Sequence, residues 1–359
     1  MRSQNIFLKK RIKGLQKELR ALDCTVCVIE NPTDLYYLTN TKLSSGRLYV
    51  DKKGGCLFVD GRYEELAKKS SPLPVVLQSK SAELDYLDKV RAKKIAFDSH
   101  TTSYLDYEKF ASFLKKGVKL KPSPRILSEL RAVKDSEELK LIRKSAKLNL
   151  LGLNHIRRIL KPGITEKEVA KEYELFCLKH GAEKLAFKPI IAFGKNSSMP
   201  HYRAGNARLK ANDIALVDIG VVVDSYYSDM TRTLFIGKAN PTLDHMAKVV
   251  KRAHAAALAL CRPGTRVGEL DAAARKVMAK EKLEHLFIHS LGHGVGLEIH
   301  EFPRLKAKGE DAKVVLKKGM VITIEPGLYL PHKGGIRHED TIVITNKGYE
   351  NLYSGLKGV

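Results

Sequence analysis

The chain lacks any long apolar run. None of its 359 residues belong to an uninterrupted apolar stretch near the roughly 20 residues that a membrane-spanning helix needs, so we expect no passage through a bilayer. It also lacks the apolar core of a secretory signal. The basic start, MRSQNIFLKKRIKGLQKELR, instead has apolar residues at helical spacing and runs into the strand-like CTVCVIE. We therefore expect a first helix of a domain here, not a targeting peptide.

Cysteine is scarce. There are five cysteines, and an odd number without a disulfide framework indicates a reducing compartment, which predicts the cytoplasm. Cys24 and Cys27 form a C-x-x-C pair, the spacing of redox and zinc motifs. They lie inside an apolar strand pattern, however, and no second pair completes four zinc ligands. We interpret them as buried small hydrophobic residues.

Acidic residues are outnumbered. The 40 Asp and Glu face 64 Lys and Arg, which gives a formal net charge of +24. Such a charge attracts nucleic acid when it is concentrated on one surface. Here the lysines are scattered, and there is no RNP motif, zinc-finger spacing or uninterrupted basic arm. We expect a solvated basic surface and no specific nucleic-acid binding.

Length and pattern predict two domains. A hydrophobic content of 43% and a charged content of 29% indicate a folded chain, and its length exceeds one ordinary core. Residues 1–125 alternate strand-like and helix-like segments, with a Lys-Gly-Gly hairpin turn, as in a small α/β unit. The proline-bearing KPSPRI reads as a linker. Residues 126–359 form the predicted second domain.

A layout repeats within the second domain. A helix beginning at Asp135-Ser136 stops at Pro162-Gly163, and a T-x-x-E capping box at Thr165 starts the next helix. Helix, Pro263-Gly264 and a helix with Glu269 repeat this order. The repeat predicts two similar α+β halves that face each other with a site between them. Chance similarity of helix-ending signals is the alternative.

Two aspartates stand out in ANDIALVDIGVVVDSYYSDMTRTLFIG, which reads as a tight pair of strands. Asp218 lies within an apolar run, where a carboxylate is costly to bury unless it is paired or binds a cation. Asp229 follows on the returning strand, so that both carboxylates can converge on a hard or borderline divalent cation. Ordinary strand-end aspartates at turns are the alternative.

Histidines and glutamates complete the pattern. His289, His293 and His300 occur in the glycine-rich FIHSLGHGVGLEIHEFPR, which favours a site over isolated core histidines. Glu325 follows the apolar strand VITI, and Glu339 stands at the mouth of another strand. Two Asp, one His and two Glu, all on strands, suit two ions roughly 3.5–4 Å apart. A structural zinc site would instead be rich in Cys and His.

At this point the chain resembles a known family. The segments VDIG, YSDMTRT, HSLGHGVGLEIHE, TIEPG and GGIRHED are together similar to the pita-bread metallopeptidases, which include methionine aminopeptidase, Xaa-Pro aminopeptidase and proline dipeptidase. The resemblance implies a creatinase-type α/β domain over 1–125 and a pita-bread catalytic domain with pseudo-twofold α+β halves over 126–359. It also implies a homodimer.

The resemblance implies a role for each acidic or imidazole ligand. Asp218 would bind one divalent ion, His293 and Glu325 the other, and Asp229 and Glu339 would bridge them. The ions, Mn²⁺ foremost with Co²⁺ or Zn²⁺ as alternatives, would activate a bridging water, with Glu325 as the proton acceptor. The implied enzyme is a dinuclear metallopeptidase.

The resemblance extends to the surrounding residues. His300 matches the histidine that stabilises the tetrahedral intermediate, and His201 matches one that contacts the substrate near the leaving group. His289 matches a histidine of the proline-specific branch, and Arg337 matches an arginine that orients the bridging carboxylates.

His289 and the first domain, both of which methionine aminopeptidases generally lack, indicate the proline-specific branch of the family. We expect hydrolysis of peptides with proline in the second position, by an Xaa-Pro aminopeptidase or by an Xaa-Pro dipeptidase restricted to dipeptides. A non-catalytic pita-bread binding module is the alternative from another class. Lys188, where relatives usually carry an acid, and His338, where an apolar residue is more frequent, depart from the pattern.

Overall fold

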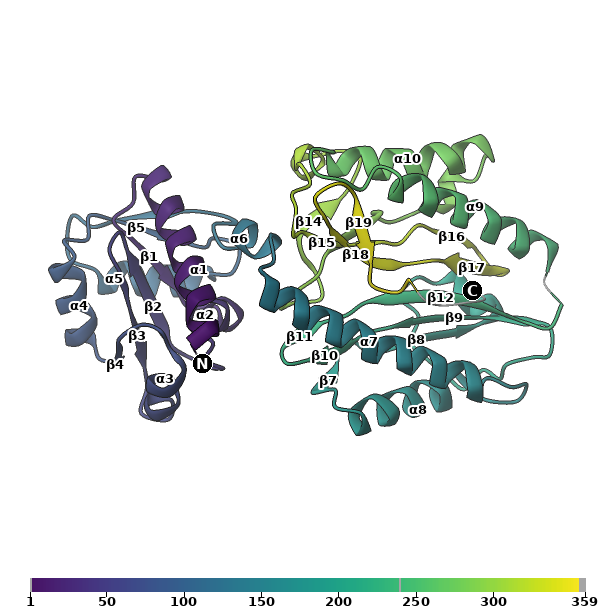
Figure 1. The fold of residues 1–359 in the computed structure, drawn as a ribbon, viewed down its shortest axis with the longest axis horizontal. Coiled ribbons are helices and arrows are strands. Elements are labelled where there is room, and N and C mark those ends of the chain that lie inside the picture. Colours follow the sequence, from purple (N-terminus) through teal and green to yellow (C-terminus); the bar gives the residue numbers. More distant parts are fainter. Residues whose placement is uncertain (1, 239, 355–359) are drawn as a thin grey trace. The chain divides into compact units, whose positions relative to one another are not determined.

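The structure is a computed structural model, and it describes residues 2–238 and 240–354. The chain divides into two compact units, Met1–Arg131 and Ala132–Val359 (Figure 1). Among the described residues, no helix is both long and apolar enough to cross a membrane.

The first unit is built on one six-stranded sheet with the order β4-β3-β2-β1-β5-β6. Strand β2 pairs antiparallel with both β1 and β3, whereas the other neighbours in the sheet are parallel, so β2 alone runs against the other strands. Its strands are β1 (Val26–Ile29), β2 (Arg47–Asp51), β3 (Gly55–Val59), β4 (Val75–Leu77), β5 (Lys94–Phe97) and β6 (Lys119–Pro122). Its helices are α1 (Arg2–Ala21), α2 (Pro32–Thr39), α3 (Glu64–Ser70), α4 (Lys80–Lys89), α5 (Tyr104–Phe113) and α6 (Ser128–Ala132).

The prediction of a small α/β unit is confirmed, including the hairpin. The Asp51 carboxylate accepts hydrogen bonds from the amides of Lys53 and Gly54, which holds the β2–β3 turn. Helices α2, α4 and α6 were not predicted from the sequence. Cys24 and Cys27 are buried free thiols, as expected.

The end of the first unit differs from the expected linker. Lys121 and Pro122 do not form a linker, because they complete β6. The first unit continues to Arg131, whose Nη1 donates to Asp34 Oδ1 at 2.8 Å within that unit.

The second unit contains a first helix pair and its strands. Asp135 and Thr165 form capping boxes at the starts of α7 and α8, as predicted. The apolar core of this half includes Tyr173, Ile191 and Val217. Its elements are α7 (Ser136–Ile159), α8 (Glu166–Lys179), β7 (Lys184–Leu185), β8 (Ile190–Phe193), η1 (Gly194–Ser198), β9 (Asp213–Ile219), β10 (Val221–Val223), β11 (Tyr226–Tyr227) and β12 (Met230–Ile236).

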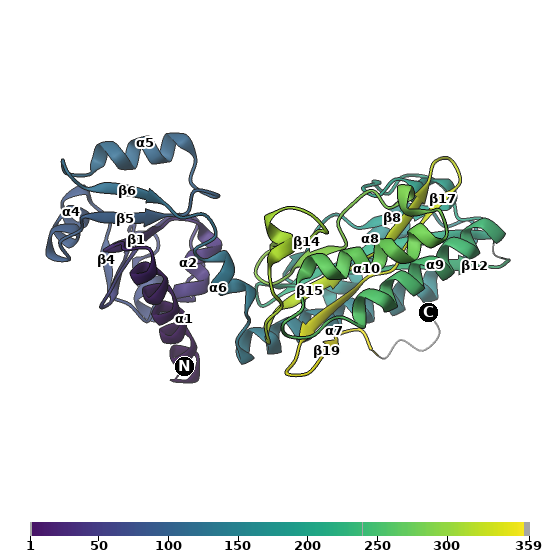
Figure 2. The same cartoon turned by 90° about the horizontal axis from the view of Figure 1, so that it is seen from above.

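The other half has its own helix pair, and its core joins Val250, Leu270 and Ile322. Helices α9 and α10 lie over the strands on one side and α7 and α8 on the other (Figures 1 and 2). Its elements are α9 (Pro241–Leu258), α10 (Val267–Lys280), η2 (Glu284–Leu286), β13 (Gly292–Gly294), β14 (Glu301–Leu305), η3 (Glu310–Lys313), β15 (Val321–Ile324), β16 (Gly327–Leu330), β17 (Gly334–Arg337), β18 (Asp340–Ile344) and β19 (Tyr349–Asn351).

The repeated layout has a matching geometry in both halves. Gly163 and Gly264 have φ of +95° and +94°, a region that favours glycine. The Gly163 amide donates to the Leu209 carbonyl at 2.8 Å, and the Gly264 amide donates to the Leu316 carbonyl at 3.0 Å. The two helix connections are therefore one turn used twice.

Candidate metal centre

Strand pairing in the first half brings the two aspartates together. Strands β9 and β12 are antiparallel, and Asp218 lies opposite Thr231. Between them, β10 and β11 form a hairpin whose turn residues, Asp224 and Ser225, have positive φ. Asp229 directly precedes β12, so it returns beside Asp218, as the sequence predicted. Both are buried.

The second half contributes the other three side chains. His293 lies in β13, Glu325 directly follows β15, and Glu339 stands between β17 and β18. The expectation that all five lie on strands is wrong for Asp229, Glu325 and Glu339, which occupy strand ends. The backbone is still held there, since the Glu325 amide donates to the Leu291 carbonyl at 2.8 Å and the Glu339 amide donates to the Thr231 carbonyl at 3.1 Å.

Distances join the contributions of the two halves. His293 Nε2 lies 3.6 Å from Asp229 Oδ2 and 3.5 Å from Glu325 Oε1. Ligand atoms of Asp229, His293 and Glu339 all lie within 4.8 Å of one another. Asp229, just before β12, thus meets His293 of β13, Glu325 just after β15 and Glu339 between β17 and β18 at one buried site.

The residues fit divalent ions. Asp218 Oδ1 and Glu339 Oε1 are buried and accept no hydrogen bond, although buried carboxylate oxygens normally have partners. Oxygen atoms with a single imidazole form a donor set for hard or borderline ions such as Mn²⁺, Co²⁺ or Zn²⁺. An ion among them would satisfy both oxygens.

The electrostatics of the site also call for cations. Burial, followed by repulsion from neighbouring carboxylates, raises the pKa of Asp229 and of Glu325 well above the ordinary range. The same two causes raise the pKa of Glu339 to about 8. Burial lowers the pKa of His293 to about 3, which leaves a neutral imidazole suited to a metal.

Arg337 holds the carboxylate cluster from one side. Its Nη2 donates to Asp218 Oδ2 at 2.5 Å, its Nε to Thr231 Oγ1 at 3.1 Å, and its Nη1 to the Tyr329 hydroxyl at 2.6 Å. Thr231 Oγ1 in turn donates to Glu339 Oε2 at 2.6 Å. Arg337 therefore fixes two of the carboxylates, one directly and one through Thr231.

His289 joins this network through Tyr329. Its Nε2 lies 2.9 Å from the Tyr329 hydroxyl, and burial lowers the pKa of its ring to about 4. Tyr329 and Thr231 were missed from the sequence, because each stands in an ordinary strand pattern. The alternation of side chains along the strands that neighbour Asp218 and Arg337 could have identified Thr231 and Tyr329 as facing the site.

His300 and His201 lie at the rim. The rings of His293 and His300 meet edge to face with centroids 4.3 Å apart. His201 is exposed and follows η1, and its charge acts on both His289 and His300. Lys188 is exposed just before β8. All nine predicted site residues thus belong to one unit, with the imidazoles grouped beside the carboxylates.

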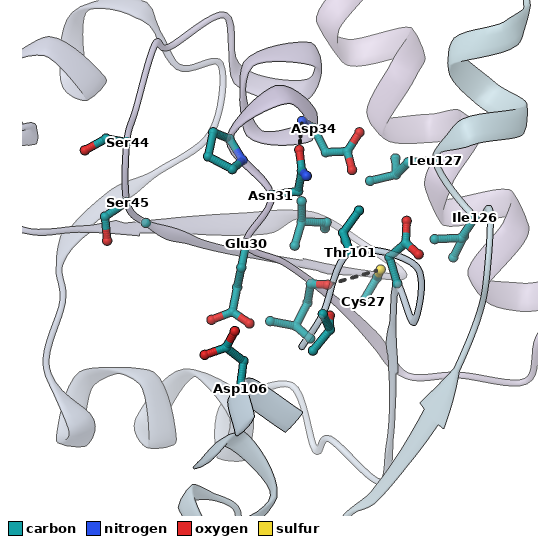
Figure 3. Close-up of a pocket in the computed structure, with 16 residues that line it drawn as sticks. Cys27, Glu30, Asn31, Asp34, Ser44, Ser45, Thr101, Asp106, Ile126 and Leu127 are labelled. Atoms are coloured by element: carbon teal, nitrogen blue, oxygen red, sulfur yellow. Dashed lines mark hydrogen bonds between the residues drawn. The ribbon is translucent and has the colours of Figure 1, made fainter. Parts of the chain in front are cut away.

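The first unit has a separate cavity of about 440 Å³ at the ends of β1 and β5. The carboxylates of Glu30 and Asp106 face each other across it (Figure 3). Glu30 is paired with Arg47 at 2.6 Å, and Ser103 donates to Asp106 at 2.6 Å. These acids are satisfied within the unit, and the cavity holds no histidine.

Comparison with known proteins decides the family. Residues 140–346 match the model of metallopeptidase family M24, and residues 11–133 match the creatinase/prolidase N-terminal domain. The chain belongs to metallopeptidase family M24. This M24 enzyme is a metal-dependent peptidase, and the matched segment contains all five candidate ligands. Its α/β and α+β architecture agrees with the prediction.

Relatives of this M24 peptidase extend over the whole chain. It is 36% identical to an Xaa-Pro dipeptidase of Pyrococcus furiosus, over 96% of this chain and 98% of the relative. The solved Xaa-Pro dipeptidase from Bacillus anthracis has a TM-score of 0.93 at 28% identity and covers 98% of this chain and 99% of that one. An X-Pro aminopeptidase from Thermotoga maritima has a TM-score of 0.86 at 26% identity, over 95% and 99%.

Proposed function

We propose that this M24 peptidase is a proline-specific exopeptidase, which hydrolyses the bond between an N-terminal residue and a following proline. The observation that carries the proposal is the convergence of four carboxylates and His293 beside the His289–Tyr329–Arg337 network. The relatives' names support both forms of the activity. We therefore propose either an Xaa-Pro aminopeptidase or an Xaa-Pro dipeptidase restricted to dipeptides, and the length of the peptides that are cleaved distinguishes the two.

The proposed ligand set holds two divalent ions, Mn²⁺ foremost and Co²⁺ or Zn²⁺ as alternatives. Asp218 would bind one, His293 and Glu325 the other, and Asp229 and Glu339 both. When bound, such ions polarise a carbonyl and lower the pKa of a water. The unpartnered oxygens of Asp218 and Glu339 support this assignment.

Side chains of the protein then carry the proton and the substrate. Glu325, the most exposed of the carboxylates at 17%, is the proposed proton acceptor. His300 is proposed to donate a hydrogen bond to the oxygen that gains charge in the transition state. His201, exposed on its loop, is proposed to contact the substrate near the leaving group, and Arg337 orients the bridging acids.

His289 supports the proline preference. A prolyl residue has no amide hydrogen and a fixed ring, so its acceptance requires a dedicated surface. The His289 ring packs edge to face on Phe287, with centroids 5.0 Å apart, and its Nε2 is occupied by Tyr329. Held this way, the ring presents an apolar, oriented face to a substrate.

The wider assignment has three parts. The creatinase-type domain, expected over 1–125, is proposed to extend to Arg131, and the catalytic domain, expected over 126–359, to follow it. The five buried free cysteines support a cytoplasmic location, where thiols stay reduced. A homodimer acting on peptide substrates, without specific nucleic acid, completes the proposal.

The test is a metal-restored assay. Chelator-treated protein receives Mn²⁺, Co²⁺ or Zn²⁺ and is offered Xaa-Pro dipeptides, Xaa-Pro-Yaa tripeptides and Met-Ala peptides. Cleavage of both proline substrates supports the aminopeptidase, and cleavage of dipeptides alone supports the dipeptidase. Absence of any metal-dependent cleavage would overturn the enzyme assignment in favour of a binding module. Preference for Met-Ala would overturn the proline specificity.

A further inference from the structure

A second group of possible ligands lies behind the candidate centre. His254 is on α9, His338 follows β17, and Asp340 begins β18. Their ligand atoms all lie within 4.8 Å of one another. Asp340 Oδ2 is 3.4 Å from His254 Nε2 and 3.9 Å from His338 Nε2. His254 Nε2 is buried and has no hydrogen-bond partner.

We propose that His254, His338 and Asp340 bind an additional late transition-metal ion, Zn²⁺ being the best fit. Two imidazoles and one carboxylate, with a fourth position open to water, match the three-ligand zinc sites of proteins. Imidazole ligands favour Zn²⁺, Co²⁺ or Ni²⁺ over Mn²⁺ and Mg²⁺. This site thus differs in metal preference from the oxygen-rich centre.

The ligand atoms are in a suitable chemical state. Burial lowers the pKa of His254 to about 4, so this inner imidazole is neutral near pH 7. The Arg232 guanidinium pairs with Asp340 Oδ1 at 2.6 Å, and Asn351 donates to Oδ2 at 2.7 Å. Oδ2 keeps a second lone pair on the side of the two histidines.

Strand alternation separates this group from the candidate centre. Successive side chains of an extended chain point to opposite sides. Glu339 therefore points to one side, where Thr231 donates to it, while His338 and Asp340 point to the other, where Arg232 meets Asp340. The two groups therefore lie on opposite sides of residues 338–340 and of the neighbouring β12.

An ion can reach the group from outside. A cavity of about 490 Å³ lies between α9, β12 and β17, and His338 is one of its lining residues. The His338 side chain is 18% exposed, whereas that of His254 is 7% exposed behind it. His338 is thus the accessible ligand and His254 the inner one.

The experiment measures metal content of the full-length protein. Chelator-treated wild type and His338→Ile are equilibrated with Zn²⁺ or with Mn²⁺, desalted and analysed by plasma emission. We expect His338→Ile to hold about one Zn²⁺ fewer per chain, with its affinity at this site reduced by at least roughly 10- to 100-fold. Its Mn²⁺ content and peptidase rate should equal those of the wild type. His254→Gln should repeat the result.

Removing the candidate centre isolates the proposed site. Asp229→Ala is compared with the double variant Asp229→Ala/His338→Ile, using Co²⁺ absorption as a second readout. We expect the single variant to retain a histidine-ligated Co²⁺ that the double variant lacks. Equal Zn²⁺ content of wild type and His338→Ile would overturn the proposal. So would loss of Mn²⁺ and activity together with Zn²⁺ in folded His338→Ile, because the cluster would then only support the candidate centre.

Discussion

Each half of the second unit uses a buried acid to hold a loop that carries a histidine, but the two halves do so in different ways. In the first half, the wholly buried Glu166 at the start of α8 accepts hydrogen bonds from the Phe193 and Gly205 amides, at 2.8 and 2.9 Å, and from Asn196 and Tyr202. These donors span the segment that carries His201. One carboxylate therefore fixes a whole loop directly.

In the second half, the buried acid acts through an arginine. Asp271 of α10 accepts from Arg275 Nε at 3.0 Å, and Arg275 donates to the carbonyls of Phe287 and His289 at 3.2 and 2.7 Å. Arg275 is 26% exposed, whereas Asp271 is 2% exposed. A repeated helix pair thus positions a histidine-bearing loop in each half, with the tighter arrangement in the first.

The largest expected effect tests whether the halves share the ions. Asp229→Ala removes a proposed bridging ligand, so we expect loss of bound Mn²⁺ and a rate loss of roughly 10³-fold, the equivalent of several kcal/mol. His300→Ala should retain the metal and lose roughly 10²- to 10³-fold in kcat, the effect of removing one transition-state donor. Equal metal loss in both variants would contradict the assigned roles.

Next in size is the direct anchor of the first half. Glu166→Gln removes the charge that four donors share, and we expect a free energy of unfolding lower by about 1–3 kcal/mol. Because the His201 loop loosens, KM should rise while the Mn²⁺ content stays unchanged. Denaturant unfolding and steady-state kinetics measure both. Glu172→Gln, an exposed change on the same helix, is the control, and equal effects of the two would refute the anchor.

A smaller effect is expected from the indirect anchor. Arg275→Met keeps the packing on Phe287 but removes the bonds to Asp271 and to two carbonyls, which we expect to cost about 1–2 kcal/mol of stability for a partly exposed group. The KM for Xaa-Pro peptides should rise less than in Glu166→Gln. Lys276→Met, its exposed neighbour, serves as the control. A larger KM change in Arg275→Met than in Glu166→Gln would reverse the comparison.

The smallest effect concerns the burial of the acids from the two halves and the repulsion between them. The folded-state pKa of Glu339 is about 8 against an ordinary 4.5, so the folded, metal-free protein binds a proton that the unfolded chain has released. Its stability is therefore greatest below about pH 4.5 as far as this group is concerned, and it falls as the pH rises toward about 8. Asp229 and Glu325 are shifted in the same direction.

Thermal melting of chelator-treated protein from pH 5 to 8.5 should thus show a falling Tm, and added Mn²⁺ should raise the Tm more at the higher pH. A metal-free Tm that rises over this range would show that the carboxylates do not repel one another in the folded protein.

Much of the fold follows from local signals. Short segments were enough to predict the capping boxes at Asp135 and Thr165 and the two Pro-Gly turns, because the end of a helix depends only on neighbouring residues. Helices α2 and α4 were not predicted, although the side chains of Asn31 and Ser79 cap their first turns. KPSPRI was wrongly predicted to be a linker, because its first proline, Pro122, ends the edge strand β6, where proline is tolerated.

The five candidate ligands of this M24 peptidase were predicted from the sequence alone, since a carboxylate beside a buried strand is costly without a partner and the order of the segments resembles that of the family. Tertiary structure decided everything that depends on which strands face each other. The approach of β12 to β17 and β18 sets Thr231 between Arg337 and Glu339, and the packing of α9 on β17 brings His254 to Asp340, just beyond that strand. Such contacts join residues about 100 positions apart in the sequence. Local sequence patterns do not predict them, because they form only when the backbone is folded.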